Sequence, residues 1–123
     1  MRASDSRLVI IIDDDESVRE SLPDLVKMLG YSAQAFASAE AFLASDRIDA
    51  TAALVLDVAM PGMCGPELHR ELRRRRVEVP VVYITAQRDP TIRSTLLDMG
   101  AVECLFKPFS DTQLLNALDA AFR

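Results

Sequence analysis

Acidic residues cluster directly after an apolar run near the amino end of the chain. The segment RLVIIIDDDESVRE (residues 7–20) places Asp13, Asp14, Asp15 and Glu16 where a buried strand would give way to a helix. One acid at such a junction is ordinary, because its side chain caps backbone N–H groups and the helix dipole favours negative charge there. We expect Asp15 to fill that role. The other acids repel one another and need positive charge close by.

Three more polar residues follow apolar runs later in the chain. They are Asp57 after AALVL, Thr85 after VPVVYI and Lys107 after AVECLF. If these runs are strands of a parallel sheet, their carboxyl ends lie at one edge of the sheet, where ligands bind in open α/β folds. We therefore expect these three side chains to share a crevice with Asp13 and Asp14.

The pattern of the whole chain supports such a sheet. Short apolar runs alternate with segments whose apolar residues have helical spacing. Gly30 ends the first helix, Asp89 followed by Pro90 begins the fourth, and Ser110 with Gln113 forms a capping box that begins the fifth. This alternation predicts an α/β, doubly wound, five-stranded parallel sheet with five helices and strand order 2-1-3-4-5, a flavodoxin-like fold. The expected strands are residues 8–12, 33–36, 52–56, 79–84 and 101–106.

Composition narrows the class of protein. The chain has 123 residues, half of them apolar, which suits one domain with its own core. A net charge of −5 argues against direct binding to nucleic acid, and no segment approaches the roughly 20 apolar residues that span a membrane. Cys64, Cys104 and the single His69 form no zinc motif, and two separated cysteines fit a reducing compartment. We expect a cytoplasmic protein, with His69 on the surface of a helix.

Charge balance indicates what the predicted crevice binds. Asp13, Asp14 and Asp57 carry three negative charges, and Lys107 cancels one of them. A divalent cation would balance the rest, and few protein carboxylates suit Mg2+, which keeps several waters and shares its shell with phosphate. Phosphoryl transfer uses such a cation, and a carboxylate can be its nucleophile. Glycoside hydrolysis fits poorly, because Lys107 would lower the pKa of an acid that must stay protonated.

Four segments together resemble the receiver domain of two-component response regulators: IIDDDESVRESL, LVLDVAMPGMCGPEL, YITAQ and LFKPF. The resemblance covers residues 7–122, and we expect residues 1–123 to be a single receiver domain, with any output domain outside this chain. The segment FASAEAFLAS and the KPF ending are most similar to the FixJ and NarL-type branches, whose output is commonly a helix-turn-helix domain. The resemblance thus implies a signalling phosphoacceptor that controls transcription rather than an enzyme.

The resemblance also assigns roles to individual residues. Asp57 matches the residue that accepts a phosphoryl group from a sensor histidine kinase in a Mg2+-dependent reaction. Asp13 and Asp14 match the acidic pair that holds Mg2+ together with Asp57, and the backbone carbonyl of Ala59 completes the metal shell. No small-molecule substrate beyond the phosphodonor is implied.

Two further residues match the machinery that reads phosphorylation. Thr85 matches the hydroxyl that turns toward the bound phosphoryl group, and Lys107 matches the lysine that pairs with it. The response is expected on the face of the fourth helix, fifth strand and fifth helix, with homodimerisation on phosphorylation. One position departs from the family, because Cys104 stands where receivers usually carry a switching aromatic. Strand alternation puts Phe106 on the same side, so it is expected to replace that aromatic in part, and Cys104 is expected to be a small buried residue.

Two other functions fit parts of the sequence. A receiver that acts only as a phosphate-independent docking module is compatible with Cys104. In a haloacid-dehalogenase-type phosphatase, residues 13–17 would form the first motif, with Asp13 as nucleophile, but this function leaves Asp57 without a role.

The run Arg73 to Arg76 is expected to be a solvated helix end, since cations are favourable at the carboxyl end of a helix.

Overall fold

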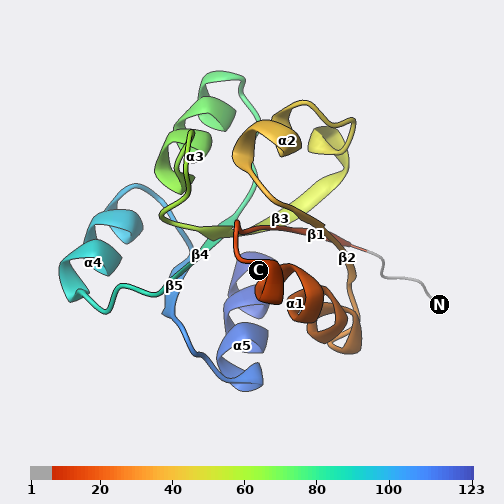
Figure 1. The fold of residues 1–123 in the computed structure, drawn as a ribbon, viewed down its shortest axis with the longest axis vertical. Helices are drawn as coiled ribbons and strands as arrows, with labels where there is room; N and C mark the ends of the chain where they lie inside the picture. Colours follow the sequence, from red (N-terminus) through yellow and green to blue (C-terminus); the bar gives the residue numbers. More distant parts are fainter. Residues whose placement is uncertain (1–6) are drawn as a thin grey trace.

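The computed structural model describes residues 7–123, so the first six residues of the predicted domain lie outside the described part. Five parallel strands form one sheet in the order β2-β1-β3-β4-β5, which confirms the predicted fold (Figure 1). The strands are β1 (Leu8–Ile12), β2 (Ser32–Phe36), β3 (Thr51–Asp57), β4 (Val81–Thr85) and β5 (Glu103–Phe106). The fourth strand begins later than predicted, because Pro80 has no N–H group to give to the ladder.

Helices α1 and α5 cover one face of the sheet, and α2, α3 and α4 cover the other (Figure 1). The helices are α1 (Glu16–Met28), α2 (Ala39–Leu43), α3 (Gly65–Arg74), α4 (Pro90–Asp98) and α5 (Asp111–Ala121), with a short 3-10 turn η2 (Ile48–Ala50). The predicted helix signals are confirmed. Asp89 caps α4, Ser110 and Gln113 form the capping box of α5, and Gly30 follows α1 with a φ of 102°.

Alternation along the strands divides the core into two layers. Ile10 and Leu54 point toward α2, α3 and α4, whereas Val9 and Val55 point toward α1 and α5, and all four are fully buried. Strands buried on both faces require continuous apolar runs, which is why the sequence shows no polar alternation there. At roughly 1.5–3 kcal/mol for each large apolar side chain, this burial is what holds the carboxyl ends of the strands in place.

Candidate functional site

Strand register brings the predicted acids together. Ile12 of β1 pairs with Leu56 of β3, so the next residues, Asp13 and Asp57, lie side by side at the carboxyl ends of these strands. One carboxylate oxygen from each of Asp13, Asp14 and Asp57 lies within 4.8 Å of the others. Asp13 and Asp57 are buried, while Asp14 is exposed. The cluster is therefore built into the edge of the sheet and opens to solvent on the side of Asp14.

Lys107, directly after β5, supplies positive charge to this cluster. Its Nζ lies 2.8 Å from Oδ2 of Asp13 and 3.8 Å from Oδ1 of Asp57. Its backbone N–H donates to the carbonyl of Thr85 at 2.8 Å, and its peptide bond with Pro108 is cis. Partial burial acts against the charged lysine, but the hydrogen bond to Asp13 and the nearby Asp57 carboxylate outweigh it and raise the pKa of Lys107. The lysine stays protonated at neutral pH.

One ammonium group does not balance three carboxylates. Burial, followed by repulsion from Asp13, raises the pKa of Asp57 to about 7, although Lys107 acts in the opposite direction. A buried carboxylate with such a pKa is stabilised by additional positive charge. Hard oxygen donors with an unbalanced negative charge are the donor set that Mg2+ prefers, so the residues present fit this cation.

Backbone contacts hold the first acidic segment in shape. The Asp15 N–H donates to Oδ1 of Asp13 at 2.9 Å, and the Arg19 guanidinium donates to the Asp13 carbonyl at 3.0 Å. The side chain of Asp15 caps α1 by accepting from the N–H and hydroxyl of Ser17, and these bonds lower the pKa of Asp15. The expected capping role of Asp15 is confirmed. The contact of Arg19 was not predicted, although Arg19 lies one helical turn after the capping residue, where its side chain can reach back to the end of β1.

Thr85 ends β4 beside the acidic cluster and is 1 % exposed. Its Oγ1 accepts a hydrogen bond from the backbone N–H of Gln87 at 3.1 Å. The hydroxyl is thus engaged with the loop that leads to α4. Ala59 is exposed in the loop after β3, two residues beyond Asp57. The structure therefore gathers the predicted residues at one edge of the sheet.

The position that departs from the family lies beside an aromatic on the neighbouring strand. Cys104 is buried, as expected, and Phe106 is half-buried, with its ring centroid 5.9 Å from the Arg88 guanidinium. Tyr83 of β4 is the register partner of Cys104 and is fully buried in the same apolar cluster. Tyr83 was not predicted as a neighbour of Cys104, because an aromatic residue within an apolar strand gives no local sign of which side chains it contacts.

The prediction that His69 is a surface residue is wrong. His69 is 4 % exposed, and its Nδ1 lies 3.0 Å from the hydroxyl of Tyr83. On α3 it shares the buried face with Gly65, Leu68 and Leu72, as helical spacing of three and four residues requires. The prediction relied on the charged sequence neighbours of His69 and overlooked this spacing. Burial, followed by the charge of Arg73, lowers the pKa of His69.

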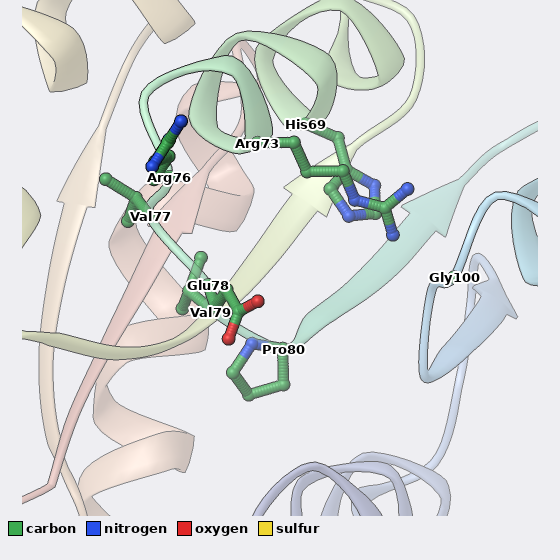
Figure 2. Close-up of a pocket in the computed structure, with 8 residues that line it drawn as sticks. All are labelled: His69, Arg73, Arg76, Val77, Glu78, Val79, Pro80 and Gly100. Carbon is green, nitrogen blue, oxygen red and sulfur yellow. The ribbon is translucent and has the colours of Figure 1, made fainter.

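His69 also lines a pocket of about 720 Å³ below α3, shown in Figure 2. Pro80 and Gly100 line it from the segments that precede β4 and β5. The pocket therefore lies toward the amino ends of these strands and is separate from the acidic cluster.

All four residues of Arg73 to Arg76 are exposed, which confirms the predicted solvated helix end, and two of them form ion pairs with Glu71.

Comparison with known proteins agrees with this geometry. Residues 9–119 match the family model described as the response regulator receiver domain. The chain is 40% identical over 119 residues to nodulation protein W of Bradyrhizobium diazoefficiens, covering 97% of this chain and 52% of that protein. It is 38% identical over 113 residues to the transcriptional regulatory protein FixJ of Rhizobium meliloti, covering 92% of this chain and 55% of that protein.

A crystal structure of FixJ-N superposes with a TM-score of 0.84 and 36% identity, covering 96% of this chain and 94% of that one. The chain belongs to the response regulator receiver domain family. It is a signalling phosphoacceptor domain of the two-component type rather than a classical enzyme. The chain spans about half the length of the curated relatives it matches. Among residues 7–123, no helix has the length and apolar character that a membrane crossing requires.

Proposed function

We propose that Asp57 accepts a phosphoryl group from a sensor histidine kinase and that this chain is the receiver domain of a transcriptional response regulator. The observation that carries the proposal is the cluster around Asp57. A buried carboxylate with a raised pKa lies among Asp13, Asp14 and Lys107 at the carboxyl ends of the strands. This arrangement of carboxylates and an ammonium group suits phosphoryl transfer, which depends on the placement of the reacting groups and on neutralising the charge of the phosphoryl oxygens.

The proposed transfer replaces an N–P bond with an O–P bond. The N–P bond of the phosphohistidine breaks, a bond forms between phosphorus and a carboxylate oxygen of Asp57, and the imidazole nitrogen takes a proton from solvent. Lys107 Nζ, already 3.8 Å from Asp57, pairs with an oxygen of the transferred group. The Asp57 carboxylate must be ionised to attack.

The residues proposed to hold Mg2+ are Asp13, Asp14, Asp57 and the backbone carbonyl of Ala59. When bound, Mg2+ supplies positive charge to the phosphoryl oxygens. The two buried acids of this set are fixed by the sheet, whereas Asp14 is exposed. This difference suits a cation that keeps part of its water shell.

The readout is proposed to begin at Thr85 and to reach the face formed by α4, β5 and α5. A phosphoryl oxygen would attract the Thr85 hydroxyl, which now accepts from the N–H of Gln87. The following residue, Arg88, donates to the carbonyl of Lys107 at 3.3 Å. Arg93 of α4 forms a 2.7 Å ion pair with Glu103 of β5. Movement of the loop before α4 is thereby coupled to β5, and homodimerisation through this face would transmit it to an output domain outside this chain.

A neighbouring groove is proposed to receive the kinase. It has a volume of about 430 Å³ and is lined by Val18, Leu22, Leu25, Phe109 and Lys107, among others. Because Lys107 borders both the groove and the acidic cluster, a partner seated there would bring its phosphohistidine to Asp57. The lining is mostly apolar, as the centre of a protein interface requires.

The phosphatase alternative is not supported, because Asp13 is fully buried and engaged by Lys107, and the family match is to receivers. Intact-mass analysis after treatment with acetyl phosphate and Mg2+ tests the proposal. The wild type should gain one phosphoryl group, and Asp57→Asn should gain none. An adduct that persists in Asp57→Asn and disappears in Asp13→Asn would overturn the proposal, and a wild type without any adduct would favour the docking module.

A further inference from the structure

We propose that Glu40 is a positioning residue, which holds the loop after Asp57 in the shape that presents the Ala59 carbonyl. The inference rests on the proposed function, since it concerns the metal site named there. Glu40 lies in α2, outside the acidic cluster, and its carboxylate Oε2 accepts a hydrogen bond from the backbone N–H of Met63 at 2.8 Å. The two residues are 23 positions apart in the chain.

The loop between β3 and α3 is held at its two ends by backbone hydrogen bonds. The Val58 N–H donates to the carbonyl of Ile84 at 3.1 Å, and the Gly65 N–H donates to the carbonyl of Val58 at 3.0 Å. Between these ends, residues 59–63 make one hydrogen bond within the described chain, and it is the bond to Glu40. The carbonyl proposed to bind Mg2+ therefore belongs to a segment that this carboxylate secures.

Gly62 shows how closely the Glu40 carboxylate approaches the backbone of this loop. Its φ is +74°, and a Cβ atom placed there would lie 2.5 Å from Oε2 of Glu40. A side chain at this position would both strain the backbone and displace the carboxylate. The turn is thus shaped to let the Glu40 carboxylate approach its backbone.

The helix that carries Glu40 is itself firmly anchored. Ser38 caps α2 by accepting from the N–H of Ala41 at 3.0 Å, and Phe42 is 1 % exposed in the core. Phe42 also contacts Phe36 of β2, with ring centroids 5.6 Å apart. Glu40 is exposed, so it has no packing role in the core. A side chain on a fixed helix can therefore set the position of the loop, while Met60 packs into the core beneath.

Three variants separate a positioning role from a purely electrostatic one. Glu40→Ala removes the acceptor, and Glu40→Gln keeps an oxygen acceptor but removes the charge. Glu20→Ala is the matched control, because Glu20 is an exposed helical glutamate on α1 and its removal changes the net charge equally. Mg2+ affinity is measured by calorimetry, and hydrogen exchange of the Met63 amide is measured by NMR in the metal-free protein.

Glu40→Ala should weaken Mg2+ binding about tenfold, the lower range for loss of a residue that orients a metal ligand. Its Met63 amide should also exchange at least about tenfold faster, because the hydrogen bond that protects it is gone. Glu40→Gln should stay within about threefold of the wild type in both measurements, and Glu20→Ala should match the wild type.

Two results would overturn the inference. The first is that Glu40→Ala binds Mg2+ with wild-type affinity and that its Met63 amide exchanges at the wild-type rate. The second is that Glu40→Gln binds Mg2+ as weakly as Glu40→Ala does. Failure of the proposed function is distinguishable, because wild-type protein would then bind no Mg2+ and form no adduct at Asp57. The Met63 exchange rates would still show in that case whether Glu40 holds the loop.

Discussion

The ammonium group of Lys107 is hydrogen-bonded to Asp13 at 2.8 Å, while the nearest oxygen of Asp57 lies 3.8 Å away. In the unphosphorylated domain the lysine therefore compensates mainly the fully buried acid. A phosphoryl group on Asp57 would compete with Asp13 for the same ammonium group. In the proposed reaction the lysine would therefore serve both the resting site and the phosphorylated one.

Replacing Lys107 should test its compensating role. In metal-free protein, Lys107→Met should lower the free energy of unfolding by about 3 kcal/mol, since removal of one partner leaves the other charge buried and unpaired. Mg2+ should then raise the melting temperature more than it does in the wild type, because the site is more negative. Chemical denaturation and calorimetry measure both effects. Lys27→Met, which removes an exposed lysine on α1, is the control, and equal behaviour of the two variants would contradict this prediction.

The raised pKa of Asp57 should make metal-free stability depend on pH. The pKa rises from 3.8 to about 7 on folding, so between these values the native state holds a proton that the unfolded chain has released. The free energy of unfolding of the wild type should therefore fall, relative to that of Asp57→Asn, as the pH rises from about 4 to about 7. Urea titrations in excess chelator measure this difference. Parallel pH curves for the two proteins would rule out the raised pKa.

His69 should contribute a pH dependence of the opposite sign. Its pKa is lowered from 6.5 by burial and by Arg73, so protonation favours the unfolded chain. The contribution of His69 is complete above the unfolded pKa and is lost as the pH falls below about 6.5. Acidification from pH 7 to pH 5 should therefore destabilise the wild type more than His69→Gln, as measured by thermal unfolding with chelator. If the difference in melting temperature between the wild type and His69→Gln stayed constant from pH 7 to pH 5, the prediction would be contradicted.

The apolar groove beside Lys107 should matter for a protein donor but not for a small one. The phosphodonor is a purified, autophosphorylated histidine kinase core that phosphorylates the wild type. Leu25→Ala should slow phosphoryl transfer from this kinase about tenfold, because the variant loses a central apolar contact. Phosphorylation by acetyl phosphate should be unchanged. Met28→Ala is the matched control, because Met28 lies on the same helix but is 83% exposed and outside the groove. If Leu25→Ala slowed phosphorylation equally with the kinase and with acetyl phosphate, the defect would lie in the acidic cluster and not in the groove.

Phosphorylation should change self-association through the α4-β5-α5 face. Beryllofluoride, a phosphoryl mimic, should shift wild-type protein toward dimer in sedimentation velocity, and Asp57→Asn should not respond. Arg93→Ala, which breaks the ion pair between α4 and β5, should reduce the shift by about threefold in dimer affinity. A wild type that binds beryllofluoride without any change in association or in amide chemical shifts on this face would contradict the proposed readout.

Local sequence patterns were sufficient for the elements and for the location of the site. Apolar runs buried on both faces, the capping residues Asp15 and Ser110, and Gly30 act within a few residues of chain, so each can be recognised without the fold. Once the strands are parallel, their carboxyl ends must share an edge, and the convergence of Asp13, Asp57 and Lys107 follows.

Tertiary structure alone decided which side chains pair. Lys107 and Asp13 are 94 residues apart, Met63 and Glu40 are 23 apart, and His69 and Tyr83 are 14 apart. No local pattern marks these contacts, because they depend on strand register and on the face that each helix turns to the sheet. The sequence by itself thus determined the fold and the edge where the acids meet. The packed structure determined that Lys107 binds Asp13 more closely than Asp57, that His69 is buried, and that the Glu40 carboxylate accepts a hydrogen bond from Met63.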